Sequence, residues 1–294
     1  MFRRFFAAGL PEARTSGVAS GVGAMSMATV RQPAVSGRFY PGRPDDLRRD
    51  LDRLLAAART SGVPGSPPRA MIVPHAGYAY SGPTAALGYV QVEALRTRIS
   101  RVVLLGPSHY VPFPGLALPT SDRFATPLGE VPVEPADGLL RLPQVVRWDA
   151  PHEREHSLEV QLPFLQSVLD AFTLLPLVVG DATPEDVAQV IEACWGGPET
   201  LVLISSDLSH YRPYADARAM DADTVRRILA LQWPLPERRA CGAVGVNGMV
   251  VVARARGLRP VLVDARNSGD TAGDRARVVG YATVRFEEVR SDQG

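Results

Sequence analysis

Apolar positions recur along the chain in two alternating patterns, which together predict an α/β fold. Short and almost continuously apolar runs predict strands that are covered on both faces, and longer mixed segments between them predict helices. The predicted strands are 69–74, 101–105, 172–179, 200–205, 260–264 and 278–287. The predicted helices are 43–60, 81–98, 156–171, 184–195, 214–231 and 241–257. This order indicates a three-layer sandwich with a mostly parallel central sheet.

The same pattern sets the expected domain limits. Residues 29–290 are expected to form a single α/β domain, whereas residues 1–28 are rich in small residues and follow a short basic and apolar start. We expect residues 1–28 to be a disordered extension, or to reflect a mis-assigned start with Met25 or Met27 as the true one. No window reaches the ~18 consecutive apolar residues of a membrane span.

Charge and composition exclude several function classes. All 32 basic residues are arginine, and the net charge is +1. Without lysine there is no Schiff-base chemistry and no lysine-containing phosphate loop. The near-zero net charge argues against nucleic-acid binding, and no membrane partner is expected. Two cysteines do not make a disulfide framework, so a cytoplasmic location is expected.

Three of the five histidines follow predicted apolar strands. His75, His109 and His210 each lie just beyond such a strand. Ligands bind outside the carboxyl ends of strands in open α/β sheets, and imidazole is the commonest metal ligand. A single histidine in this position is more often a hydrogen-bonded structural residue, but three equivalent ones favour a site. His75 and His109 could bind one metal ion.

Cys241 and Asp207 are the next candidates. Cys241 opens a predicted helix after Arg238 and Arg239, so we expect a depressed thiol pKa that favours metal binding or nucleophilic attack. The alternative is a small buried core cysteine. Asp207 lies three residues before His210 and could orient its ring for proton transfer, or could be no more than a helix cap.

One further motif matches a known pattern literally. Residues 152–156 read His-Glu-Arg-Glu-His, the arrangement of a zinc protease helix. That motif must lie inside a helix, whereas Pro151 and the acidic residues indicate a helix start. We therefore expect no protease site here.

Several segments in order along the chain resemble the Memo family. They are residues 74–82 (Pro-His-Ala-Gly-Tyr-Ala-Tyr-Ser-Gly), 106–109 (Gly-Pro-Ser-His), 155–164 (Glu-His-Ser-Leu-Glu-Val-Gln-Leu-Pro-Phe), 205–211 (Ser-Ser-Asp-Leu-Ser-His-Tyr), 241–242 (Cys-Gly), 267–270 (Asn-Ser-Gly-Asp) and 279–282 (Val-Gly-Tyr-Ala). Residues 30–41 are similar to the usual start of that family. The resemblance covers about residues 30–287.

The resemblance implies a fold like that of the class III extradiol dioxygenases, in which two histidines and a glutamate hold Fe(II). It implies that His75, His109 and Cys241 are metal ligands, with Cys241 in place of the glutamate, and that His210 and Asp207 are the catalytic pair. The remaining candidates for substrate contact or for support of the metal ligands are Tyr78, Ser108, His156 and Asp270. Bacterial members are often associated with radical-SAM and AMMECR1-like proteins, which are therefore possible partners.

Three function classes remain open. The principal hypothesis is a metal-dependent redox enzyme with one transition metal ion per chain, iron first and copper or zinc as alternatives. Thiolate is softer than carboxylate, which weakens the inference to ring cleavage. The second is a non-catalytic protein that binds a peptide or partner in the same pocket. The third is a hydrolase with a metal-activated water, for which zinc would fit. The substrate, an unknown small molecule or peptide, does not follow from the sequence.

Overall fold

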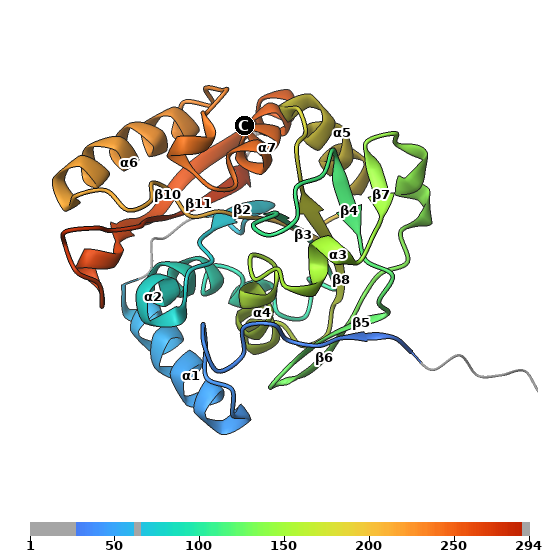
Figure 1. Ribbon diagram of the computed structural model, residues 1–294, viewed down its shortest axis with the longest axis horizontal. Coiled ribbons are helices and arrows are strands. Elements are labelled where there is room, and N and C mark those ends of the chain that lie inside the picture. Colours follow the sequence, from blue (N-terminus) through green and yellow to red (C-terminus); the bar gives the residue numbers. More distant parts are fainter. Residues whose placement is uncertain (1–27, 62–65, 290–294) are drawn as a thin grey trace, which may run out of the picture.

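A sheet of eight strands forms the centre of the computed structural model, which describes residues 28–61 and 66–289 (Figure 1). Its four inner strands are parallel neighbours. In spatial order they are β2 (Ala70–Val73), β9 (Thr200–Ser205), β3 (Arg101–Pro107) and β8 (Thr173–Val179). All residues of β2 and β9 are buried, as expected for strands covered on both faces.

Strands of mixed direction extend the sheet on both sides. Next to β2 lie the antiparallel strands β11 (Gly280–Glu288) and β10 (Leu258–Asn267). Next to β8 lies the antiparallel strand β4 (Leu116–Leu118), followed by β7 (Val145–Arg147). A separate small sheet contains β1 (Val30–Arg31), β5 (Arg123–Thr126) and β6 (Gly129–Pro132).

Helices cover both faces of the large sheet, so the predicted three-layer α/β arrangement is confirmed (Figure 1). One face carries α1 (Pro44–Thr60), α2 (Tyr78–Tyr89) and α4 (Leu162–Val168). The other carries α5 (Pro184–Cys194), α6 (Tyr214–Leu229) and α7 (Ala243–Ala255). Alternation along β3 divides the core, because Val102 and Leu104 pack on the first face and Val103 and Leu105 on the second.

Short helical segments fill several connections. They are α3 (Ala150–Glu153), η1 (Glu93–Leu95), η2 (Asp137–Arg141), η3 (Glu159–Gln161), η4 (Glu237–Arg239) and η5 (Ser268–Asp270). No helix within residues 28–61 and 66–289 is long and apolar enough to cross a bilayer. The prediction for residues 1–28 falls almost entirely outside the described residues, which begin at 28.

One departure from the predicted elements lies at residues 156–171. A continuous helix was expected, but the α-helix begins only at Leu162, followed at once by Pro163. The preceding residues 155–161 form a loop and η3, and their polar side chains point inwards. Glu155 and Glu159, for example, are buried and hydrogen-bonded to groups distant in the sequence.

The Glu159 carboxylate ties the first described residues to the domain. It accepts hydrogen bonds from Arg31 Nη1 (2.8 Å), from the N–H groups of Ala34 and Val35 (2.6 and 2.9 Å) and from Tyr40 Oη (2.7 Å). Arg31 and Glu159 are both buried, so the desolvation of their charges must be offset by hydrogen bonds in addition to the ion pair itself.

Arg31 extends this network to the loop that precedes η3. It donates to the backbone carbonyls of His152 (2.8 Å) and Glu155 (2.6 Å). The N-terminal segment therefore fixes the path of the chain around Glu155.

Replacing Glu159 by Gln should destabilise the fold by about 3–5 kcal/mol, because it leaves the buried Arg31 charge uncompensated. The measurement is the free energy of unfolding in urea. Glu93→Gln is the matched control, since Glu93 pairs with Arg59 at the surface and its loss should cost less than about 1 kcal/mol. Equal costs for the two variants would contradict the assignment.

Candidate metal centre

Three strand ends bring the sequence-predicted side chains to one edge of the sheet. His75 lies two residues beyond β2, and His109 lies two residues beyond β3. Residues 206–210 follow β9, which lies between those two strands. Parallel neighbours end at the same edge, so these segments meet there.

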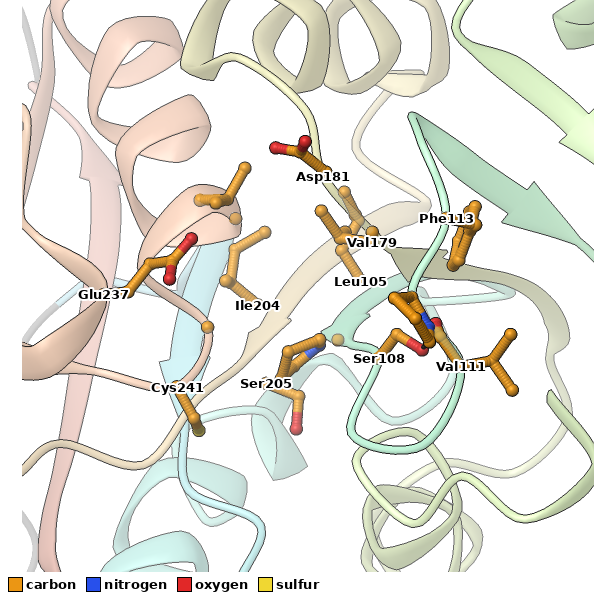
Figure 2. Close-up of a pocket in the computed structure, with 17 residues that line it drawn as sticks. Leu105, Ser108, Val111, Phe113, Val179, Asp181, Ile204, Ser205, Glu237 and Cys241 are labelled. Atoms are coloured by element: carbon orange, nitrogen blue, oxygen red, sulfur yellow. Dashed lines mark hydrogen bonds between the residues drawn. The ribbon is translucent and has the colours of Figure 1, made fainter. Parts of the chain in front are cut away.

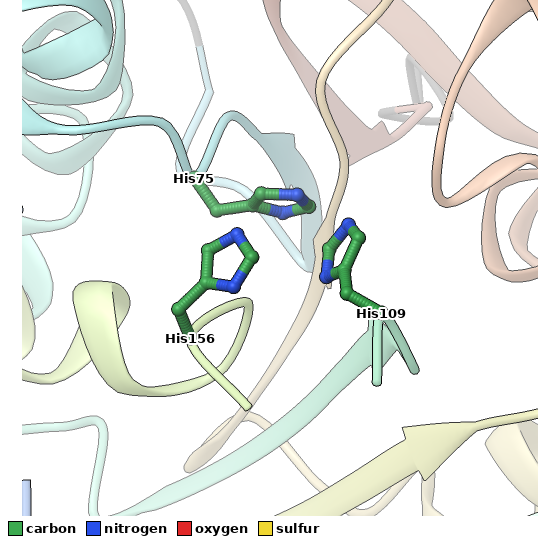
Figure 3. A group of neighbouring side chains, drawn as sticks. All are labelled: His75, His109 and His156. Atoms are coloured by element: carbon green, nitrogen blue, oxygen red, sulfur yellow. The ribbon is translucent and has the colours of Figure 1, made fainter. Parts of the chain in front are cut away.

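A third histidine joins His75 and His109. His156, from the loop after α3, completes a group in which one ligand atom per residue lies within 4.8 Å of the others. Figure 3 shows the three rings directed toward one another. The ring centres of His109 and His156 are 4.4 Å apart, and His75 lies edge-on to both at 5.2 and 5.4 Å. Imidazole nitrogens at this spacing suit a transition metal ion.

Hydrogen bonding determines which nitrogen of His75 carries the proton. Ser205 Oγ lies 2.9 Å from His75 Nδ1, donates to the carbonyl of Ser157 (2.6 Å) and accepts from Gln161 Nε2 (2.8 Å). The only Ser205 hydroxyl proton is therefore used, and Nδ1 of His75 must donate to the remaining lone pair. Nε2 is left unprotonated and accepts from the Cys241 thiol at 3.2 Å.

Glu155 plays the same part for His109. Its Oε1 lies 2.8 Å from His109 Nδ1, and its Oε2 accepts from the His109 backbone N–H at 2.6 Å. A carboxylate that accepts at Nδ1 leaves Nε2 of His109 free to bind a metal.

The pKa of Glu155 keeps that carboxylate ionised. Burial alone would raise it, but the hydrogen bonds and charge of His109, with further help from the N–H of Ser157, lower it to about 2. Sequence reasoning missed this role of Glu155. In the sequence, the position of Glu155 directly before His156 is the one feature that could indicate this role, but an acidic residue at a helix start explains that position equally well.

The environment keeps the two less exposed histidines neutral. Burial, with a smaller contribution from the charge of His109, lowers the pKa of His75 to about 3. Burial, together with the charge of His75, lowers the pKa of His156 to about 4. Both rings are therefore unprotonated at neutral pH, as metal ligands must be.

Cys241 lies beside the cluster, but its electrostatics differ from our expectation. The expected depressed pKa is wrong, because burial and the nearby Asp207 charge raise the pKa of the thiol. Arg239, expected to lower it, instead pairs with Asp223 at 2.8 Å. The Asp207 backbone N–H donates to Sγ at 3.3 Å. A bound metal would be needed to ionise this thiol near neutral pH.

Asp207 and His210 both lie at this edge, and each has a different hydrogen-bond partner. The buried Asp207 carboxylate accepts from the backbone N–H of His75 at 2.7 Å, and burial raises its pKa. His210 Nδ1 instead donates to the carbonyl of Leu208 at 2.8 Å. The orienting role of Asp207 therefore stays a prediction, and Nε2 of His210 forms no hydrogen bond with a described residue.

The other three predicted residues have partners outside the histidine cluster. Tyr78 is buried and its hydroxyl donates to the carbonyl of Val160 (2.7 Å). Ser108 donates to the carbonyl of Val111 (2.7 Å). Asp270 lies between α6 and β10, and it accepts from the Tyr214 hydroxyl at 2.5 Å. Their predicted roles in substrate contact remain predictions.

Two cavities flank the centre. The first, of about 560 Å³, is lined by Ser108, Ser205 and Cys241 (Figure 2). The second, of about 400 Å³, is lined by His156, Asp207 and His210. Of these two cavities, only the second is lined by one of the three clustered histidines.

The zinc protease motif is not formed. Helix α3 ends at Glu153, so His152 and His156 do not share a helix face. His152 Nε2 hydrogen-bonds the carbonyl of Ala117 (2.9 Å), and its ring lies edge-on to Phe124. His152 is a buried structural residue.

Comparison with known proteins decides the family. A family model described as Memo-like protein matches residues 31–285. The chain belongs to the Memo family.

Curated relatives from archaea and bacteria match over almost their whole length. A MEMO1 family protein of Sulfurisphaera tokodaii is 33% identical over 282 residues, which covers 87% of this chain and 99% of the relative. A MEMO1 family protein of Methanosarcina barkeri is 37% identical, and the match covers 88% of this chain and 100% of the relative. A MEMO1 family protein of Aquifex aeolicus is 36% identical, with 87% of this chain and 99% of the relative covered.

A solved structure shows a more distant likeness. It is the crystal structure of an uncharacterized protein from Escherichia coli K12, with a TM-score of 0.46 and 11% identity. The match covers 73% of this chain and 98% of that one. This likeness is too remote to inform the Memo family site.

Replacing Ser205 by Ala should weaken metal binding about 10–100-fold, because His75 loses the partner that fixes its tautomer. The measurement is the dissociation constant for Zn²⁺ or Co²⁺ by competition with a chelating dye. Ser167→Ala is the matched control, since Ser167 donates to a helix carbonyl on α4. Unchanged affinity in Ser205→Ala would contradict the assigned tautomer.

The metal-free protein should lose stability as the pH falls from about 6.5 toward 4. Burial lowers the pKa of His152 to about 4, so the unfolded chain takes up a proton in this range that the folded chain refuses. The share of His152 is on the order of 3 kcal/mol. Urea unfolding at several pH values should show a flatter profile for His152→Gln than for wild type, and parallel profiles would refute this assignment.

Proposed function

We propose that this Memo family chain is a metal-dependent redox enzyme whose ion is held by His75, His109 and His156. The observation that carries the proposal is the convergence of these three ring nitrogens within 4.8 Å. We expect iron as the native ion, and copper or zinc also match imidazole donors.

The chain's own contacts prepare these ligands. Nδ1 of His75 and Nδ1 of His109 donate to Ser205 and Glu155, which leaves both Nε2 lone pairs available. The lowered pKa values of His75 and His156 mean that binding displaces no proton from either ring near pH 7. The ionised Glu155 also adds a negative charge that partly offsets that of a cation.

Cys241 extends the donor set. Its Sγ lies 3.2 Å from His75 Nε2, close enough for both atoms to reach one ion. Because the thiol is protonated without metal, we propose that it becomes a fourth ligand when the ion lowers its pKa. A thiolate favours iron, copper and zinc over the harder cations.

A bound iron or copper ion would supply the electron-transfer chemistry that no side chain of the site performs. His210 would accept or return the substrate proton, since its Nε2 is free and its ring lines the 400 Å³ cavity beside His156. Asp207 holds the backbone at His75, because its carboxylate accepts the N–H of that residue.

Elemental analysis of protein purified without oxygen should find one metal ion per chain. His75→Ala, His109→Ala and His156→Ala should each lower the metal content at least tenfold, because each removes one of three ligands. Spectra before and after O₂ should differ if iron or copper is the native ion. In cobalt-substituted protein, a sulfur-to-metal band that is lost in Cys241→Ser would show the fourth ligand.

Cys194→Ala is the control for Cys241→Ser, because Cys194 lies in the core on α5. It should keep both the metal content and the cobalt spectrum. A folded protein that binds no metal when iron, copper and zinc are supplied would overturn the proposal and leave the non-catalytic binding role in its place. A zinc-only protein with no response to O₂ would favour hydrolysis instead.

A further inference from the structure

The cavity of about 560 Å³ beside Cys241 has no part in the proton-transfer scheme above (Figure 2). It lies at the carboxyl ends of β3, β8 and β9, the edge where open α/β sheets bind ligands. Much of its wall is apolar, with contributions from all three strand ends and from the first turn of α7. These apolar side chains are Leu105, Val179, Ile204 and Val244. Such a wall fits the apolar body of a small molecule.

The charged groups of this cavity are all of one sign. Asp181 and Glu237 line it from the end of β8 and from η4, and no arginine does so. Figure 2 shows their carboxylates on different sides of the cavity. Neither carboxylate forms an ion pair or hydrogen bond with any residue that the structure describes.

Some acidic residues of the chain are paired with an arginine, unlike these two. Glu134 binds Arg101 through both carboxylate oxygens, and Glu192 binds Arg256 in the same way. Asp181 and Glu237 are both exposed to solvent, and the cavity therefore carries two negative charges at its surface that pair with no described residue.

The helix dipole of α7 is too weak to reverse this sign. A helix N-terminus acts as about half a positive charge, against two full negative charges. The first N–H group of the helix is also occupied, because the N–H of Ala243 donates to the carbonyl of Ala240. The net potential in the cavity favours a cation.

We propose that this cavity is the substrate pocket, and that it takes a small molecule with an apolar body and a protonated amine. The ammonium group binds between Asp181 and Glu237, and the apolar body lies on the wall that leads to Cys241. This inference rests on the proposed function, because it names the class of substrate for that metal centre. It is tested by binding alone, without turnover.

The probes are 4-phenylbutylamine, 4-phenylbutanol and 4-phenylbutyrate, which share one apolar body and differ in charge. Calorimetric titration of the metal-free full chain should show the amine binding about tenfold tighter than the alcohol, and the carboxylate weaker than both. The preference should shrink as salt rises. Backbone NMR shifts at Val244 and Gly245 should report the location, because both residues line the cavity.

The double variant Asp181→Asn with Glu237→Gln should lose the preference for the amine while still binding the alcohol. Asp216→Asn is the matched control, since Asp216 is exposed on the first turn of α6 outside this cavity. No binding of any probe, equal binding of amine and alcohol, or a preference that survives in the double variant would each overturn the inference. Because the titration uses metal-free protein, such a failure is separate from a failure to bind metal.

Discussion

The site depends on the parallel pairing of three buried strands. β2, β9 and β3 lie side by side and run in the same direction, so the loops that follow them emerge at one edge. A shift of register by one residue would turn every buried side chain of a strand to the opposite face, and both faces are packed. The positions of His75 and His109 therefore inherit the rigidity of the core.

The protonated nitrogen of each of three histidine rings is determined by groups that can only accept hydrogen bonds. The carbonyl of Ser157 takes the proton of Ser205, which sets the tautomer of His75, and the carbonyl of Leu208 does so directly for His210. The Glu155 carboxylate performs this task for His109. The ring nitrogens are thus oriented by the folded backbone and by buried side chains before any ligand binds.

The sequence predicts the regular elements well, because their signals are local. The strand at 200–205 has the predicted limits, and α5 ends one residue before the predicted 195. Residues 156–161 do not form the predicted helix, since the partners of the neighbouring Glu155 and of Glu159 lie far away in the sequence. Their pattern of polar positions looks like an exposed helix start, although these side chains point inwards.

The candidate site could be predicted only in part. The strand-end pattern and the family resemblance point to His75 and His109, whereas the approach of His156 follows from the irregular loop and has no periodic signal. For the thiol of Cys241, the neighbours in sequence led to a wrong prediction of its pKa. Two arginines precede it in sequence, but Arg239 is held by Asp223, so proximity along the chain gave the wrong electrostatics.

The unequal exposure of the three imidazoles would separate the affinity of this cluster for an ion from the rate at which an ion exchanges. The side chain of His109 is 26% exposed, whereas that of His156 is 12% exposed and His75 is buried. A chelator or a metal donor would therefore meet His109 first, and swinging that one ring outwards would open the coordination sphere without disturbing the core. A cluster of this kind would combine high affinity for an ion with rapid transfer of that ion to a chelator.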